Sequence, residues 1–297
     1  MIVDTHVHYM EPPKADRPHH TGSVNMDKLT VHRLLEEARK AGVDKIVQVN
    51  PAALAYDNRY SLEAAEQYER DVVGVIGRFD PLSERVEEEV VEFLRHPAAI
   101  GVRFAMINTW NESWLRDRSL DRVLRLASTR GFPVQIFAPN MSLDLRDTAR
   151  RFPDVRIIAD HMGVRYVPTI GAADTFRYWD ESLALAREPN VWLKVSHFPE
   201  ASSASERYPY PTSIEKFKEL YDLVGAKRLI WGSNYPPVQR ACSYRHAVDF
   251  VRVECSFLSP EDKAAILGGN FLSEFASVQW KKLATTTTPA SASEAAR

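Results

Sequence analysis

The sequence has few of the features that mark secreted, membrane or nucleic-acid-binding proteins. It contains only two cysteines, Cys242 and Cys255, without a paired C-x-x-C spacing, so two free thiols are favoured over a disulfide. No apolar run approaches the roughly 20 residues of a membrane-spanning helix, and the strand-like start at Met1 leaves no room for a signal peptide. Lysine and arginine (38) nearly balance aspartate and glutamate (40), so the composition does not predict a basic surface that binds nucleic acid. We expect a cytoplasmic protein that binds neither nucleic acid nor membranes.

Eight short apolar runs, rich in β-branched residues, alternate with segments of helical periodicity. Most runs are nearly continuous, which is typical of parallel strands that are covered on both faces. Segments such as 27–40 and 83–96 instead repeat their apolar residues on one helical face. The predicted strands are residues 2–8, 45–50, 72–79, 100–105, 133–137, 155–161, 191–197 and 228–233.

This alternation predicts an α/β protein, a single-domain (β/α)8 TIM barrel over residues 1–280. A barrel of this kind typically has about 250 residues. A doubly wound open sheet would also alternate, but it would need a glycine-rich phosphate loop after the first strand. The opening stretch MIVDTHVHYM has no such loop. The chain ends in ATTTTPASASEAAR, which lacks large apolar side chains, so residues 281–297 are expected to be disordered.

Two histidines on the first predicted strand suggest a metal site. Alternation along a strand places Asp4, His6 and His8 on one face, and Val3 and Val7 on the other. If the valines face the outer helices, both imidazoles point into the barrel. Residues two apart lie about 6–7 Å apart at Cα, so their rings can converge on one ion at about 2.0–2.1 Å. The alternative is a pair of hydrogen-bonded core histidines.

Two further polar residues lie at or just after the ends of predicted strands, on the side of the barrel where active sites of this fold lie. His161 ends the sixth strand, where it could bind a metal, exchange protons, polarise a carbonyl, or serve as a buried structural histidine. Asn234 follows the eighth strand. A neutral amide cannot take a proton from water, so Asn234 is predicted to orient water or substrate.

Three stretches carry a family resemblance: D-T-H-V-H at 4–8, A-D-H-M-G at 159–163 and W-G-S-N-Y-P at 231–236. In this order they resemble the amidohydrolase superfamily, and more closely its amidohydrolase-related branch of lactonases and decarboxylases. G-V-R-F and N-V-W-L-K-V-S, on strands four and seven, are similar to the lactonase group. The resemblance covers about residues 1–275. It implies that His6 and His8 are metal ligands where a metal is present, and that His161 binds metal or polarises substrate.

Two departures from the family pattern bear on the chemistry. Phe137 stands near the end of strand five, where a metal-binding histidine or modified lysine is common, so one divalent ion, expected to be Zn²⁺, or none is predicted. Asn234 replaces the usual aspartate that activates water. Three readings stay open: His161 acts as base on a water whose pKa an ion lowers, the reaction needs no water activation, or the site binds without turnover.

Positive and polar groups near the barrel mouth suggest the substrate. Arg103 is predicted to face inward from strand four, with Arg78 after strand three and Lys194 on strand seven. Guanidinium groups suit carboxylate ligands, although a salt bridge within the protein is the alternative for Arg103. Asn50 and Tyr210 are further predicted substrate contacts.

The resulting hypothesis is a hydrolase that opens a small lactone of a carboxylated ring or sugar acid. A decarboxylase of an aromatic or muconic acid and a catalytically silent ligand-binding relative are the alternatives. A small-molecule substrate is expected, and a homo-oligomer is left open. His197 receives no role, because alternation predicts that it faces opposite to Lys194.

Overall fold

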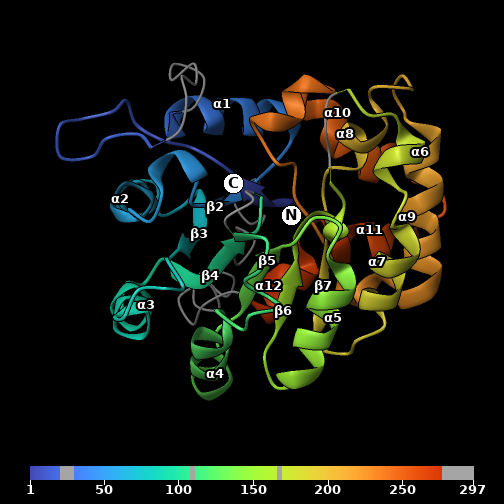
Figure 1. The fold of residues 1–297 in the computed structure, drawn as a ribbon. Helices are drawn as coiled ribbons and strands as arrows, with labels where there is room; N and C mark the ends of the chain where they lie inside the picture. Colours follow the sequence, from blue (N-terminus) through green and yellow to red (C-terminus); the bar gives the residue numbers. More distant parts are fainter. Residues whose placement is uncertain (21–29, 108–110, 166–168, 276–297) are drawn as a thin grey trace, which may run out of the picture.

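The computed structural model describes residues 1–20, 30–107, 111–165 and 169–275. Its centre is an eight-stranded parallel sheet in which each strand pairs with the next along the chain (Figure 1). The predicted strands are all present, with ends that differ by up to two residues. The strands are β1 (Val3–Val7), β2 (Lys45–Val49), β3 (Val72–Arg78), β4 (Ala99–Ala105), β5 (Val134–Phe137), β6 (Ile157–Ala159), β7 (Val191–Val195) and β8 (Leu229–Trp231).

Contacts between the first and last strands bring the sheet round into a nearly closed barrel. The His8 N–H donates to the Tyr235 carbonyl at 2.8 Å, and the Asn234 N–H donates to the His6 carbonyl at 2.9 Å. Val7 and Tyr235 form an isolated parallel bridge. The chemistry-bearing stretches of β1 and β8, more than two hundred residues apart, are therefore direct neighbours, and the predicted barrel is confirmed.

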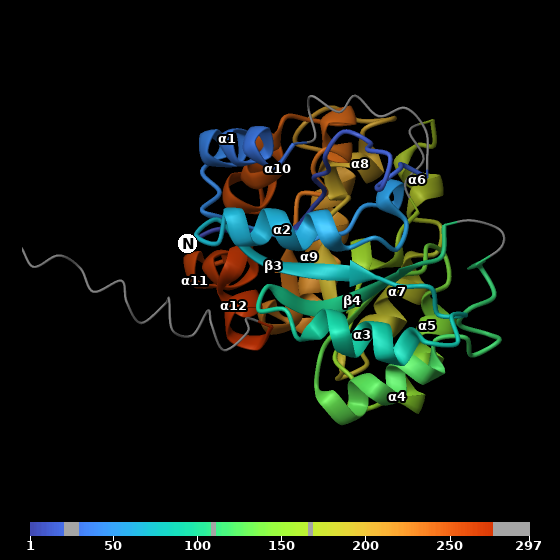
Figure 2. The same cartoon turned by 90° about the vertical axis from the view of Figure 1, so that its left-hand side faces the viewer.

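Helices surround the strands, as Figures 1 and 2 show from two directions. Helix α11 begins with a capping hydroxyl: the Ser259 side chain accepts from the Asp262 N–H, and Pro260 lies in the first turn. The helices are α1 (Val31–Ala41), α2 (Arg59–Gln67), α3 (Val86–Leu94), α4 (Asp121–Arg130), α5 (Ser142–Arg151), α6 (Ala172–Thr175), α7 (Trp179–Ala186), α8 (Phe198–Ser202), α9 (Pro211–Val224), α10 (Tyr244–Asp249), α11 (Pro260–Ala264) and α12 (Asn270–Glu274).

An apolar cluster joins residues of six strands to the C-terminal segment around α12. Phe271 and Phe275 belong to this cluster, and Figure 2 shows α12 on the same side of the molecule as the N-terminus. The buried members of the cluster are Val3, Val47, Val49, Val73, Ile76, Ile100, Ile158, Ile230, Phe271 and Phe275.

The facing predicted for the start of β1 is wrong. Val3 belongs to the apolar cluster, and Asp4 turns outward, where its Oδ2 accepts from the Tyr244 hydroxyl of α10 at 2.7 Å. The pairing of β1 with β2 shifts register between Asp4 and Val7. This irregularity interrupts the alternation, so His6 still faces the interior while Asp4 does not.

Three other predictions concern the whole chain. No helix among the described residues is long and apolar enough to cross a membrane. Both cysteines are free. The tail predicted for residues 281–297 lies outside the described residues.

Candidate active site

A buried charged layer lies inside the barrel, centred on Asp160. This residue opens the turn η4 (Asp160–Gly163) directly after β6. Its Oδ2 accepts from Arg103 Nε at 2.7 Å and from Gln135 Nε2 at 2.9 Å. Lys194 Nζ lies 3.8 Å from its Oδ1 and donates to Gln135 Oε1 at 2.7 Å. Asp160 is therefore the partner of Arg103 in a buried salt bridge. The sequence did not predict Asp160 as a site residue, although it directly precedes His161.

The charges in this layer set each other's protonation. Burial by itself would raise the pKa of Asp160, but Arg103 and the other cationic neighbours outweigh it and hold that pKa well below its usual value. Burial lowers the pKa of Lys194 to about 8, because the nearby carboxylate only partly offsets the loss of solvation. Asp160 is thus ionised at neutral pH and balances the positive charge of Arg103.

A second cluster contains two of the predicted metal ligands. The ligand atoms of His6, Asp160 and His161 all lie within 4.8 Å of one another, and all three residues are buried. Both ring nitrogens of His6, and Oδ1 of Asp160, have no hydrogen-bond partner among the described residues. Buried polar atoms are rarely left unpaired, and these are the donor types that a divalent ion accepts. The residues present fit a single metal ion.

The third predicted ligand, His8, stands at the edge of this cluster. Its ring centroid is 5.0 Å from that of His6, with the two rings perpendicular. Its Nδ1 lies 2.7 Å from the Val49 carbonyl oxygen. Similarly, His161 Nδ1 lies 2.6 Å from Ser196 Oγ. A proton on Nδ1 satisfies both contacts and leaves the Nε2 lone pair for an ion, as metal-binding histidines commonly do.

The histidines are neutral at neutral pH. Burial lowers the pKa of His6 and that of His161 well below the usual value. Burial, followed by the charge of Arg103, lowers the pKa of His8 to about 4. Neutral imidazole is the form that binds metal, so an ion would not have to displace protons here.

His197 joins the site, against the prediction from alternation. Its ring stacks on that of His161, with centroids 3.5 Å apart and an interplanar angle of 1°. Strand β7 ends at Val195, and His197 adopts a left-handed conformation with φ 66°. His161 and Asn234 also have positive φ, at 53° and 60°. Alternation applies only inside a strand, so it could not place these residues.

Glu200 is a second residue that the sequence analysis missed. It lies in α8 and is fully buried. Asn234 Nδ2 is 3.2 Å from its Oε1 and 2.6 Å from His197 Nε2. Burial raises the pKa of the Glu200 carboxyl to about 8, so it is largely protonated at neutral pH. The sequence signal that could have identified Glu200 is a single acidic residue among the apolar residues Phe198, Pro199 and Ala201.

Arg78 and Arg103 stand opposite each other in the register of β3 and β4. Nη1 of Arg78 is buried without a hydrogen-bond partner in the described part of the chain. Burial, followed by the charge of Arg103, lowers the pKa of Arg78 to about 10. Two guanidinium groups side by side, one of which has a buried nitrogen without an acceptor among the described residues, form an arrangement that an anion would stabilise.

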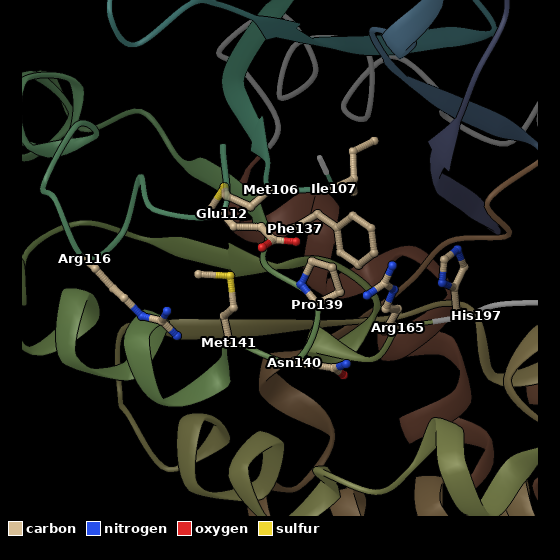
Figure 3. A pocket seen from close by; sticks show the side chains of 10 residues that line it. All are labelled: Met106, Ile107, Glu112, Arg116, Phe137, Pro139, Asn140, Met141, Arg165 and His197. Carbon is tan, nitrogen blue, oxygen red and sulfur yellow. The ribbon is translucent and has the colours of Figure 1, made fainter. Parts of the chain in front are cut away.

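A cavity of about 440 Å³ opens beside the histidines. Figure 3 shows Arg165 and His197 on one side of the view and Arg116 on the other. Phe137 connects this cavity to the deeper groups, since its ring centroid lies 4.9 Å from that of His161 and 5.9 Å from the Arg103 guanidinium carbon. The lining residues are Met106, Ile107, Glu112, Arg116, Phe137, Pro139, Asn140, Met141, Arg165 and His197.

Three predicted substrate contacts are hydrogen-bonded within the protein. Lys194 is 1% exposed, and its Nζ donates to the Thr5 carbonyl at 2.9 Å. Asn50 accepts from Ser61 Oγ, and its Nδ2 donates to a backbone carbonyl. The Tyr210 hydroxyl donates to the Ala241 carbonyl. These contacts suit supporting roles better than direct contact with a substrate.

Comparison with known proteins decides the family. A profile of the amidohydrolase family matches residues 3–270, which include all eight strands. The chain belongs to this family. The prediction made from the three sequence stretches is thereby confirmed, and it places this amidohydrolase among proteins whose active sites lie at the carboxyl ends of the barrel strands.

The chain is also similar to individual proteins that are named as lactonases, amidohydrolases or related hydrolases. An L-fucono-1,5-lactonase of Burkholderia ambifaria is 28% identical over 240 residues, which are 78% of this chain and 79% of that protein. A zinc-bound amidohydrolase from Burkholderia multivorans has a TM-score of 0.77 at 20% identity, covering 93% of this chain and 99% of its own. A probable 2-pyrone-4,6-dicarboxylic acid hydrolase from Acinetobacter baumannii, with citric acid bound, reaches 0.73 at 21% identity, covering 92% and 98%. These structures share the fold.

Proposed function

We propose that this amidohydrolase is a metal-assisted hydrolase that opens a small lactone, either of a sugar acid or of a ring that carries a carboxylate. The single observation that carries the proposal is the buried cluster of His6, Asp160 and His161, whose possible ligand atoms lie within 4.8 Å of one another beside a cavity. Both ring nitrogens of His6 and Oδ1 of Asp160 have no hydrogen-bond partner among the described residues. The lactonase relative supports the substrate class. The zinc-bound neighbour supports Zn²⁺ as the ion.

His6, Asp160 and His161 would hold the ion. When bound, it would polarise the ester carbonyl and lower the pKa of an attacking water from 15.7 to about 7. A side-chain base at the strand-eight position is then unnecessary, which fits an amide at Asn234. His161 Nε2 is accordingly assigned to the ion and not to proton transfer.

The remaining residues bind and orient. Arg78 and Arg103 attract an acidic substituent of the substrate through charge-assisted hydrogen bonds. Phe137 and His197 line the cavity wall next to the ion-binding cluster. Asn234 supplies a neutral acceptor at the end of β8, where it orients water against the carbonyl. Binding energy and orientation, which together can contribute several kcal/mol, thus come from separate parts of the site.

The test is a lactone screen with controlled metal content. Purified protein is stripped with a chelator, reloaded with Zn²⁺, and assayed by proton release against 1,4- and 1,5-lactones of sugar acids and against carboxylated pyrones. We expect turnover in the reloaded sample, near-complete loss after stripping, and stoichiometric zinc by elemental analysis. His6→Asn should abolish zinc binding, whereas His96→Asn, which changes a histidine paired with the exposed Glu66, should not. Carbon dioxide release from an aromatic acid without lactone opening would instead establish a decarboxylase.

A further inference from the structure

The side chain of Asn234 is held by two partners that come from the segment after β7. Its amide nitrogen Nδ2 lies 3.2 Å from Glu200 Oε1 and 2.6 Å from His197 Nε2. An amide nitrogen has two hydrogens, so with the His197 ring proton on Nδ1 it donates to both atoms. The amide oxygen Oδ1 has no hydrogen bond among the described residues, yet it is not one of their fully enclosed unpaired atoms.

The carboxyl oxygen of Glu200 decides which way the amide faces. An Asn side chain can be turned end over end at little steric cost, so its orientation follows from its partners. Oε1 of Glu200 can accept a hydrogen bond from the amide nitrogen in both protonation states of the carboxyl. An amide oxygen turned toward Glu200 would meet a second acceptor when the carboxyl is ionised and would need the acid proton when it is not, so only the nitrogen suits both states. Glu200 therefore fixes the nitrogen of Asn234 toward α8 and the oxygen away from it.

His197 completes the arrangement from the other side. Its ring is held by the face-to-face stack on His161 at 3.5 Å, so its Nε2 has little freedom to move. Glu200 and His197 are three residues apart, and the His197 carbonyl accepts from the Ala201 N–H at 2.7 Å. The left-handed turn at His197 thus brings both acceptors to the Asn234 amide.

We propose that Glu200 and His197 form an amide clamp, in which both hydrogens of Asn234 are held so that Oδ1 is presented to the active centre as a fixed hydrogen-bond acceptor. The inference rests on the proposed hydrolase function, in which Oδ1 orients the attacking water. Glu200 is a positioning residue here, since it acts through Asn234. The clamp gives a neutral side chain the one property of the usual aspartate that survives loss of charge, an acceptor oxygen at a defined place.

The raised pKa of Glu200 supports a positioning role over a proton-transfer role. A largely protonated carboxyl at neutral pH still offers Oε1 as acceptor. Glutamine has nearly the same shape and also offers an acceptor oxygen. Glu200→Gln should therefore preserve the clamp, whereas Glu200→Leu removes the acceptor and lets the amide turn.

The experiment compares these variants in the zinc-loaded full-length protein at pH 7. We expect Glu200→Leu to lower kcat at least tenfold with KM within about twofold, and Glu200→Gln to keep at least half of the wild-type kcat. Ser202→Ala is the matched control: Ser202 lies buried in the same helix, and its Oγ pairs with Ser213 Oγ at 2.7 Å instead of with Asn234. It should keep wild-type kcat. Wild-type kcat in Glu200→Leu, or equal losses in the Leu and Gln variants, would overturn the clamp.

A second readout does not depend on catalysis. In ¹⁵N-labelled, deuterated protein, the side-chain amide signal of Asn234 is identified by its absence in Asn234→Asp. Wild type and Glu200→Gln should show slowed hydrogen exchange at this signal, and Glu200→Leu should not. Fast exchange in wild type would overturn the clamp even if lactones are hydrolysed. Absent lactone turnover together with slow exchange would instead refute the proposed function and leave the clamp standing.

Discussion

Replacing Asp160 by asparagine should destabilise the protein more than any exposed charge change of the same size. Asp160 is the carboxylate at which Arg103, Lys194 and His6 converge, at 2.7, 3.8 and 3.5 Å. Arg103 and Lys194 are 6% and 1% exposed, so neither charge can turn to water. Removing one partner of a buried ion pair typically costs about 3–5 kcal/mol, because an uncompensated charge stays behind. We expect Asp160→Asn to lower the free energy of unfolding by about that amount.

The measurement is urea unfolding followed by circular dichroism, with a chelator present so that metal binding does not contribute. A loss of about 3 kcal/mol lowers the urea midpoint by roughly 1–3 M for ordinary slopes. Asp222→Asn is the control: its partner Lys218 is exposed and one helical turn away, so the change should be at most about 0.5 kcal/mol. Equal effects of the two substitutions would refute the reasoning.

The ion pair of Asp160 with Arg103 also predicts how stability depends on pH, and the sign follows from the depressed pKa of Asp160. Asp160 has a lower pKa folded than unfolded, so its contribution is complete above the unfolded value near 3.8. It is lost as pH falls through the folded value. The stability gap between wild type and Asp160→Asn should therefore be constant from pH 5 to 7 and narrow below pH 4. A gap that widens on acidification would contradict the assignment of Asp160 as the ionised partner.

Three further predictions test the neighbouring groups. Gly232→Ala would place a Cβ 2.7 Å from His6 Cβ and 2.9 Å from its backbone nitrogen, so zinc affinity measured by chelator competition should fall at least tenfold. Arg78→Met should raise KM for a carboxylated lactone about tenfold, roughly 1.4 kcal/mol, without changing KM for a neutral lactone or lowering stability, because Nη1 has no partner to lose in the described structure. Burial raises the pKa of Glu200 to about 8, so ionisation favours the unfolded chain between about pH 4.5 and 8. Wild type should therefore lose stability relative to Glu200→Gln over this range, and the difference should stay constant above pH 8. Urea midpoints at pH 5, 7 and 9 would show it.

The barrel and its principal histidines could be predicted from the sequence because both follow from regular patterns. Apolar runs with helical segments between them gave the eight strands. His6 and His161 were placed by their predicted positions on the first strand and at the end of the sixth, and the structure brings them together. The error at Asp4 has a local cause, since alternation assumes an unbroken ladder and the register shift in β1 breaks it.

The part of the site that escaped prediction lies outside regular structure. His197 was assigned to the wrong side because its offset from Lys194 was counted as if β7 continued, although the strand ends two residues earlier. Glu200 belongs to a short helix, and no periodic signal shows that this helix packs its charged residue against Asn234. Side chains of this kind are positioned by tertiary contacts, which a single sequence does not display.

The left-handed residues at the ends of β6, β7 and β8 have a consequence for how such an enzyme can change over time. The last ladder pairings of these strands involve Ala159, Val195 and Trp231, so His161, His197 and Asn234 lie just beyond them. Exchanging one of these side chains for another does not require new partners for the strands themselves. The positive φ at each end restricts the choice there to residues that tolerate a left-handed conformation, such as Asn, Asp, His and Gly, so variation at these sites stays within a few polar residue types while the barrel keeps its pairing.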